Sequence, residues 1–287
     1  MLLQRGDGEP GKQAWLFTGQ GSHWPGMGQA LYRHSPAFAD RLEHCLAACE
    51  SSDQPLTPSL REASLGQHGE LLERTDYAQP AIVAFELAMA AHWQSLGLQP
   101  DLVLGHSVGE FAAAVVAGHY PADAVMRLVC LRGALMQRCS GGGMLSAFAD
   151  HATLLPLAAP LGLELAACNG DRHLVFSGER EAIDAFAAAL DAREIRCNRL
   201  SVAGAAHSRQ LDPILADFQR AAASLRAAPG RLPLISTLTG EIIDAQDSTH
   251  PTTGAVTCAS RCVSSRPCAP RSRRVPTSSW NWARMPR

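Results

Sequence analysis

A serine lies between a short apolar run and a helical segment, and this arrangement limits the folds open to the chain. The apolar run at residues 102–104 leads directly into the sequence GHSVG at 105–109, and the alanine-rich segment 111–117 follows. A strand-to-helix turn this tight crowds any Cβ atom, so glycine is needed on both sides of the serine. A serine that only caps a helix would not need both glycines. The pattern predicts a nucleophile elbow with Ser107 Oγ exposed at a helix N-terminus, where backbone N–H groups stabilise negative charge.

Further blocks accompany the elbow along the chain. Residues 14–24, AWLFTGQGSHW, are typical of a strand that enters a glycine-rich loop. The other blocks are YAQPAI at 77–82, LRGALMQ at 131–137, ACNG at 167–170, AHS at 206–208 with LDP at 211–213, and STLTG at 236–240. In this order and spacing the blocks resemble those of malonyl-CoA:acyl-carrier-protein transacylases and of polyketide synthase acyltransferase domains. The resemblance covers residues 14–251, and the conjunction of blocks is far more specific than any one of them.

The organisation of the chain is predicted from its periodicity. A helix from Pro121 to about Arg138 is followed by glycines at 141–143, which break it. Strands are expected at 144–148, 163–167, 174–177 and 195–200, with helices at 152–161 and 181–192. This β-α-β-β-α-β order is the ferredoxin-like arrangement. We therefore expect an α/β fold in which an α/β-hydrolase-like large subdomain with a parallel sheet, residues 1–140 and 203–251, carries an inserted ferredoxin-like small subdomain, residues 141–202. The resemblance implies the same two-part build, with the active site between the parts.

Composition excludes several classes of function. The formal net charge of −2 gives no reason to expect a nucleic-acid partner. No apolar run approaches the roughly 20 residues that span a bilayer, so no membrane association is expected. The first residues are charged and unlike a signal peptide, which predicts a cytoplasmic protein. Nine cysteines without C-x-x-C pairs indicate reduced thiols rather than a disulfide framework or a zinc site. Met1 lies a few residues before the first strand, which fits a free-standing protein or an excised domain.

The last part of the chain has a different composition. Residues 252–287 contain seven arginines but no Asp, Glu, Leu, Ile, Phe or Tyr, so they cannot build a core. On composition alone this stretch is a disordered basic tail. The genetic code offers a second interpretation, because codons at 280–282, read from their third base, give Glu-Leu-Gly whatever the synonymous choices. The same shift permits Asp-Tyr-Trp directly after Pro251, and both strings resemble C-terminal blocks of the family. We therefore predict an aberrant, frameshifted and disordered tail at 252–287, which hides an excess of 27 acidic over 18 basic residues in the body.

Two residues are the candidates for the chemistry. Ser107 is the expected nucleophile, and a hydroxyl of ordinary pKa needs a neighbouring base. His207 lies in the block Ala-His-Ser that the family uses for its general base. No acidic partner for His207 is evident, and the resemblance implies that a backbone carbonyl orients it instead. This lack counts against an ordinary esterase triad rather than against catalysis.

The remaining site residues are assigned through the resemblance. Arg132 lies within an apolar helical stretch and matches the family's carboxylate-binding arginine, whose planar fork can hold a carboxylate with two hydrogen bonds. Gln20 and Val108 would supply backbone N–H groups to the oxyanion. The other residues expected to line the substrate cleft are Gln79, Asn169 and His106, the last of them as a structural hydrogen-bond donor at the turn. No metal and no cofactor are expected.

The implied reaction is ping-pong acyl transfer from malonyl-CoA to the phosphopantetheine thiol of an acyl carrier protein, in polyketide or fatty acid biosynthesis. Polyketide synthase modules are further candidate partners. The extender unit stays open. A valine after the serine, as at Val108, resembles the sequence of malonyl-selective domains. The small residues at 204–206, in contrast, leave room for a branched acyl group. Two alternatives also stay open. One is an α/β serine hydrolase, and the other is an acyltransferase remnant made inactive by the altered C-terminal stretch.

Overall fold

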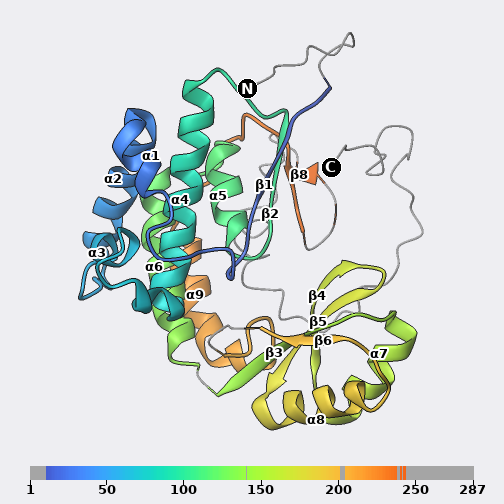
Figure 1. The fold of residues 1–287 in the computed structure, drawn as a ribbon. Coiled ribbons are helices and arrows are strands. Elements are labelled where there is room, and N and C mark those ends of the chain that lie inside the picture. The colour runs from blue at the N-terminus through green and yellow to red at the C-terminus, as the bar shows by residue number, and fades with distance from the viewer. Residues whose placement is uncertain (1–10, 140, 201–203, 238–239, 241, 244–287) are drawn as a thin grey trace.

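The computed structural model describes residues 11–139, 141–200, 204–237, 240 and 242–243. These residues form two parts, each built on its own four-stranded sheet (Figure 1). The predicted α/β fold, with a hydrolase-like large subdomain and an inserted ferredoxin-like small one, is confirmed. The predicted tail at 252–287 lies outside the described residues, as do positions 244–251 of the predicted large subdomain.

The large sheet has the strand order β1-β2-β7-β8. Its strands are β1 (Ala14–Phe17), β2 (Leu102–Gly105), β7 (Leu234–Ile235) and β8 (Ile242–Ile243). The first three strands are parallel, as predicted, whereas β8 pairs antiparallel with β7. The sheet is therefore mixed, and within the described residues β1 forms one of its edges.

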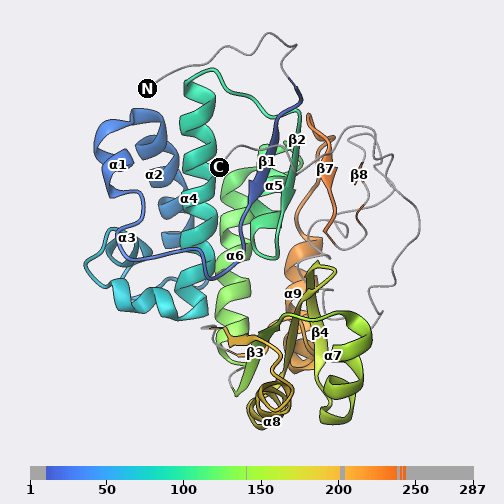
Figure 2. The same ribbon diagram turned by 45° about the vertical axis from the view of Figure 1, so that its right-hand side comes forward.

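Helices pack beside one another to one side of this sheet (Figures 1 and 2). They are α1 (Gln29–His34), α2 (Pro36–Glu50), α3 (Leu60–Ser64), the 3-10 turn η1 (Gly69–Glu73), α4 (Thr75–Ser95), α5 (Gly109–Val116), α6 (Ala122–Gln137), the 3-10 turn η3 (Arg209–Leu211) and α9 (Asp212–Ala223). The central helix is α4, which packs against α2, α5 and α6 and is apolar around most of its circumference. Its Tyr77, Ile82 and Val83 side chains are almost completely buried in the large core. No helix in the described part of the chain is both long and apolar enough to cross a membrane.

The small subdomain has the strand order β4-β5-β3-β6, with every neighbouring pair antiparallel. Its elements are β3 (Gly142–Ala147), α7 (His151–Ala158), the 3-10 turn η2 (Ala159–Leu161), β4 (Glu164–Gly170), β5 (His173–Glu179), α8 (Arg180–Asp191) and β6 (Cys197–Arg199). Leu145, Phe176 and Phe186 are fully buried between the sheet and its two helices. The opposite face of the sheet is turned toward the large subdomain (Figure 1).

Some predicted boundaries differ from the observed ones. Gly142 and Gly143 begin strand β3, although the sequence predicted that they only break the preceding helix. A Cβ atom at Gly142 would lie 2.4 Å from the Ala205 Cβ atom, so this part of the strand approaches its neighbours too closely for a side chain. The helix predicted at 152–161 becomes 3-10 from Ala159 onward. Pro160 lacks a backbone N–H and therefore cannot continue the α-helical hydrogen bonds.

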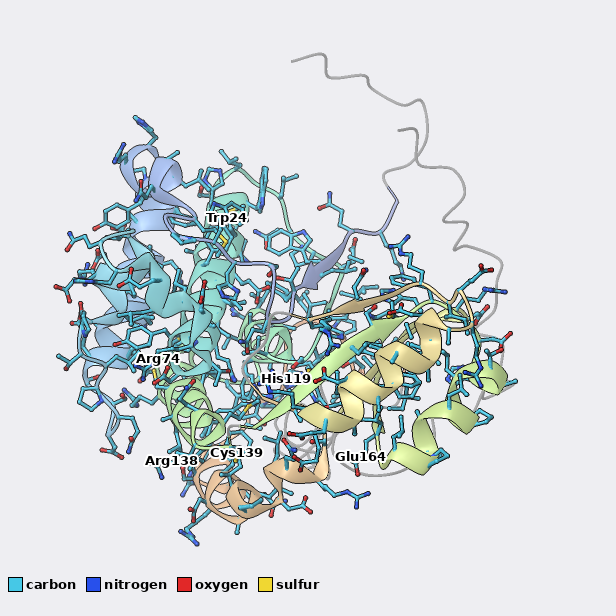
Figure 3. All side chains as sticks on the ribbon, turned by 60° about the horizontal axis from the view of Figure 1, so that its bottom comes forward. Trp24, Arg74, His119, Arg138, Cys139 and Glu164 are labelled. Carbon is cyan, nitrogen blue, oxygen red and sulfur yellow. The ribbon has the colours of Figure 1, made fainter. Side chains whose placement is uncertain are left out.

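The two parts are joined by the chain and by a side-chain contact. Figure 3 shows Arg138 and Cys139 just beyond the end of α6, where the chain leaves the large subdomain. Glu164 of β4 accepts a hydrogen bond from the backbone N–H of Arg209 at 2.7 Å and another from its side chain at 3.1 Å. Because Arg209 begins the 3-10 turn η3, which leads into α9, this contact links the small sheet to the large subdomain beside His207.

Candidate active site

The predicted elbow is formed by the end of β2 and the start of α5. Ser107 has a φ angle of 53°, in the left-handed region that a non-glycine residue adopts at a backbone cost. A Cβ atom at Gly105 would lie 2.3 Å from the Glu110 backbone nitrogen, and one at Gly109 would lie 2.5 Å from the Thr18 carbonyl oxygen. The turn therefore has no room for a side chain on either glycine. Helix α5 begins at Gly109, two residues earlier than the alanine-rich run suggests.

The structure brings Ser107 and His207 together. The Ser107 Oγ atom lies 2.9 Å from His207 Nε2, although the two residues are 100 positions apart in the sequence. His207 also has a left-handed backbone, with a φ angle of 60°, and its side chain is buried. This distance lets the imidazole accept the hydroxyl proton directly.

His207 lies in surroundings that favour its neutral form. Burial, together with the nearby charges of Arg132 and His106, lowers the pKa of its imidazole to about 3, and burial is the largest of these causes. Within the described residues, neither a carboxylate nor any hydrogen-bond acceptor contacts His207 Nδ1. Among the residues that the structure describes, the pair thus lacks the carboxylate that stabilises the imidazolium of a triad at this nitrogen.

Two backbone N–H groups border the same cleft. The residues are Gln20, in the loop after β1, and Val108, which follows the nucleophile. In the described part of the chain neither N–H group donates to a protein acceptor. Unpaired N–H groups on residues that line the cleft of a nucleophile are candidates to bind a tetrahedral oxyanion.

Arg132 lies in the cleft as a buried cation. Its side chain is 4% exposed, and its Nη1 group donates a hydrogen bond to Gln79 Oε1. The guanidinium carbon lies 5.8 Å from the centre of the Phe111 ring. Gln79 is held in turn, because its Nε2 group donates to Thr75 Oγ1 at 2.8 Å. The arginine is thus oriented by a chain of hydrogen bonds that begins on α4.

The cleft has a volume of about 210 Å³ and is shared by both subdomains. Asn169 lies at its rim near the end of β4, as the sequence predicts, and its side chain is exposed. His106 lines the cleft too, but within the described residues only its backbone makes hydrogen bonds, with its N–H donating to the Phe17 carbonyl at 2.9 Å. The hydrogen-bond donor at the turn is therefore the main chain and not the imidazole. The described residues contain no group of three His, Cys, Asp or Glu side chains that could hold a metal ion.

Comparison with known proteins places this arrangement in a family. The family model of the acyl transferase domain matches residues 14–267, which is most of the chain. This chain is an acyl transferase domain. A phenolphthiocerol synthesis polyketide synthase of Mycobacterium marinum is 40% identical over 240 residues, which are 83% of this chain and 11% of that protein.

Solved structures agree with this assignment. The acyltransferase domain from the second module of the salinomycin polyketide synthase has a TM-score of 0.78 at 36% identity, over 89% of this chain and 58% of that one. The acyl transferase domain of SpnD, solved in complex with 2-(pent-4-yn-1-yl)malonyl, has a TM-score of 0.74 at 33% identity, over 84% of this chain and 58% of that one.

The acyltransferase domain spans only a small share of the curated relatives that it matches, and between half and two thirds of these two solved chains. The family match also runs past Pro251 and includes part of the stretch predicted to be read in a shifted frame. The comparison therefore does not mark a break at Pro251, and the shifted frame stays a prediction.

Sequence reasoning missed two residues of the acyltransferase site. Thr75 links the loop after β1 to Gln79, because its hydroxyl donates to Gln20 Oε1 at 3.0 Å while accepting from Gln79 Nε2. Glu110 joins α5 to the end of β7 by accepting hydrogen bonds from the backbone and hydroxyl of Thr237. Burial raises the pKa of Glu110 to about 7. Thr75 lies four positions before Gln79, so helical spacing was the signal that could have identified it.

Proposed function

We propose that this acyltransferase domain moves a malonyl-type group from CoA to the phosphopantetheine thiol of an acyl carrier protein, through an acyl-serine intermediate. The observation that carries the proposal is a buried arginine, Arg132, in the same cleft as a Ser107–His207 pair at 2.9 Å. A guanidinium that lines the cleft beside the nucleophile is suited to bind an acyl group with a free carboxylate, because its planar fork can donate two parallel hydrogen bonds. A malonyl group carries such a carboxylate beyond its thioester.

The mechanism follows from the positions of these groups. His207 Nε2 accepts the Ser107 proton as Oγ attacks the thioester carbonyl, and the backbone N–H groups of Gln20 and Val108 stabilise the oxyanion. The tetrahedral intermediate then collapses, the C–S bond breaks and the proton leaves with the CoA thiol. In the second half-reaction the carrier thiol gives its proton to His207 and attacks the acyl-serine carbonyl. Ser107 recovers its proton when the ester bond breaks.

Arg132 is suited to select the acyl group. Its Nη1 group already donates to Gln79, which fixes the guanidinium plane before substrate arrives. A guanidinium can hold a carboxylate with two parallel hydrogen bonds. The malonyl derivative in the solved SpnD complex supports a carboxylated acyl group in this family. The small side chain of Ala206, which lines the cleft, leaves space for a branch, so the proposal extends to malonyl groups with a small α-substituent.

The surroundings of His207 favour transfer over the hydrolase alternative. A Ser-His-Asp hydrolase needs a carboxylate at His207 Nδ1, and none of the described carboxylates lies there. Hydrolysis of p-nitrophenyl esters as fast as CoA-dependent transfer would instead support a hydrolase. The proposal also includes a cytoplasmic location and action beside polyketide synthase modules.

Replacing Ser107 by alanine is expected to abolish the transfer. In this assay radiolabelled malonyl-CoA and a holo acyl carrier protein are incubated with the protein, and label on the carrier is measured. The loss should reach about 10⁴-fold or more, because the mechanism has no second nucleophile. Ser22→Ala, in the glycine-rich loop, is a control that removes a hydroxyl without touching Ser107. Transfer that survives in Ser107→Ala would remove the acyl-serine from the mechanism.

The pH dependence of acylation tests the role of His207. With its pKa lowered to about 3, the imidazole stays neutral, and acylation is expected to change by less than about twofold between about pH 5.5 and 7.5. The free energy of unfolding, unlike the acylation rate, is expected to fall in acid. The imidazole of the unfolded chain binds a proton below about pH 6.5, whereas that of the folded chain does not. The contribution of neutral His207 to folding is thus lost as the pH falls below that value. An acylation rate that halves near pH 6.5, while circular dichroism shows an intact fold, would contradict the assignment.

A second candidate, an inactive acyltransferase remnant, is favoured by one observation. An apolar groove of about 530 Å³ lies along β1 and α4, and its lining includes Trp24 and Leu16, which are 60% and 57% exposed. Figure 3 shows Trp24 at the surface of the large subdomain. An edge strand flanked by exposed large apolar side chains is a liability that native proteins usually cover.

A further inference from the structure

The face of the small sheet that lies away from α7 and α8 continues the wall of the active-site cleft. Met144 of β3 and Leu200, which follows β6, line the cleft that contains Ser107. The Leu200 N–H donates to the Met144 carbonyl oxygen at 3.0 Å, so the two residues are neighbours across the strands. Because side chains alternate along a strand, every second residue beyond Met144 lies on this same face. The face therefore forms a path that leads away from Ser107.

Two further rows of side chains follow along this path. In the first, Ser146 of β3 pairs with Asn198 of β6, which is exposed. In the second, the Phe148 N–H donates to the Arg196 carbonyl oxygen at 3.0 Å. Phe148 lies four residues beyond Met144, which is about 13 Å of extended strand. The path thus passes from apolar side chains to an amide and then to a cation.

The last row is a layered cluster. The Arg196 guanidinium lies 4.2 Å from the centre of the Phe148 ring, and Phe148 stacks on His173 with ring centres 4.6 Å apart and an interplanar angle of 16°. His173 is held in place by a hydrogen bond to Ser146, since its Nε2 atom lies 2.8 Å from Ser146 Oγ. Stacking fixes the plane of a guanidinium while its N–H groups stay available at the edge.

Arg196 differs from its neighbour Arg199 on the same strand. Arg199 pairs in register with Leu145, whose side chain lies in the helix-covered core, and forms an ion pair with Asp184 of α8. Arg196 is exposed, and no carboxylate in the described part of the chain forms an ion pair with it. Arg199 thus stabilises the small subdomain, while the charge of Arg196 lies on the path from the cleft.

The order of groups along the path matches a phosphopantetheine thioester. Such a thioester presents an acyl carbonyl, then two amides, then a phosphate. Its sulfur and phosphorus are separated by about the length of four extended residues, roughly 14 Å. We propose that Arg196, held by Phe148 and His173, binds this phosphate while the thioester lies at Ser107. The inference rests on the proposed function, since the acyl end of the ligand must lie at the nucleophile.

Direct binding to the full chain tests the site without any turnover. Calorimetry would measure the dissociation constants of CoA and of pantetheine, which lacks the phosphate, for the unmodified chain and for Arg196→Ala. We expect Arg196→Ala to weaken CoA binding about fivefold, as for an exposed charge pair, and to leave pantetheine binding unchanged. Arg199→Ala is the matched control and should leave both constants unchanged. Equal CoA affinity in Arg196→Ala and the unmodified chain would overturn the proposal.

Kinetics separate the two sources of the phosphate. Arg196→Ala should raise KM for both malonyl-CoA and the holo carrier protein while kcat is retained, because both carry the same phosphopantetheine phosphate. A rise confined to malonyl-CoA would overturn the carrier half of the proposal. The outcome also differs from failure of the proposed function. If the unmodified chain transfers nothing but Arg196→Ala weakens CoA binding, the phosphate site is supported and the proposed function fails. If the unmodified chain is active and Arg196→Ala changes neither Kd nor KM, the proposed function is supported and the phosphate site fails.

Discussion

Replacing Arg132 by alanine is expected to remove malonyl transfer while leaving acetyl transfer equal or higher. The guanidinium is buried and oriented by Gln79, so its loss removes the buried partner of the malonyl carboxylate. Opening a buried charge-assisted pair costs about 2–5 kcal/mol, which is at least about thirtyfold in kcat/KM. An acetyl group has no carboxylate, so the kcat/KM for acetyl transfer should not fall. Measuring kcat/KM for malonyl-CoA and acetyl-CoA in both proteins checks this expectation.

A second arginine on the same helix provides the control. Arg127 is exposed and forms an ion pair with Asp123 one turn away, so Arg127→Ala removes a charge from α6 without entering the cleft. It should change kcat/KM for neither substrate. An equal loss for malonyl and acetyl groups in Arg132→Ala would make Arg132 a structural residue, and a thermal melt would show whether the fold had suffered.

Restoring the shifted reading frame after Pro251 is expected to produce a more stable and more active protein. The present chain leaves an apolar groove beside β1, and the edge of that strand is unpaired among the described residues. The shifted frame supplies an apolar residue followed by Glu-Leu-Gly, which is suited to a short buried strand. Each buried large side chain contributes about 1.5–3 kcal/mol, against a net stability of roughly 5–15 kcal/mol for a whole domain. The present chain should therefore aggregate or transfer malonyl weakly.

Size-exclusion chromatography, a thermal melt and a turnover assay on both proteins would check this result. A present chain that is monomeric, melts cooperatively and turns over as fast as the restored one would show that residues 252–287 are a harmless appendage. Sequencing the gene across Pro251 in all frames provides an independent test, because synonymous codons there either permit the family's C-terminal strings or exclude them.

The sequence predicted those parts of the fold that local chemistry determines. The elbow was evident because Gly105 and Gly109 meet backbone atoms that leave no space for a Cβ atom. The order of the small subdomain followed from alternation and helical periodicity, and its strand order agrees with the ferredoxin-like arrangement. Boundaries were less accurate where tertiary contact overrides propensity, as at Gly142, which packs against Ala205 from another part of the chain.

The site was predicted only in part because some of its contacts are not encoded by any local pattern. The sequence motifs identified Ser107 and His207, but their 2.9 Å contact depends on how two distant segments fold together. The role of Thr75 depends on hydrogen bonds to Gln20 and Gln79, one of which lies in a remote loop. The antiparallel strand β8 was likewise missed, because a pair of isoleucines at 242–243 is too short to show periodicity.

The acyl-enzyme itself is the most direct test of the account. The chain would be incubated with malonyl-CoA, quenched in acid and digested, and the peptide that contains Ser107 would be weighed by mass spectrometry. We expect a malonyl mass on that peptide in the unmodified chain and none in Ser107→Ala, whose circular dichroism spectrum should be unchanged. A malonyl mass that persists in Ser107→Ala, or one found on another residue of a folded chain, would contradict the central claim.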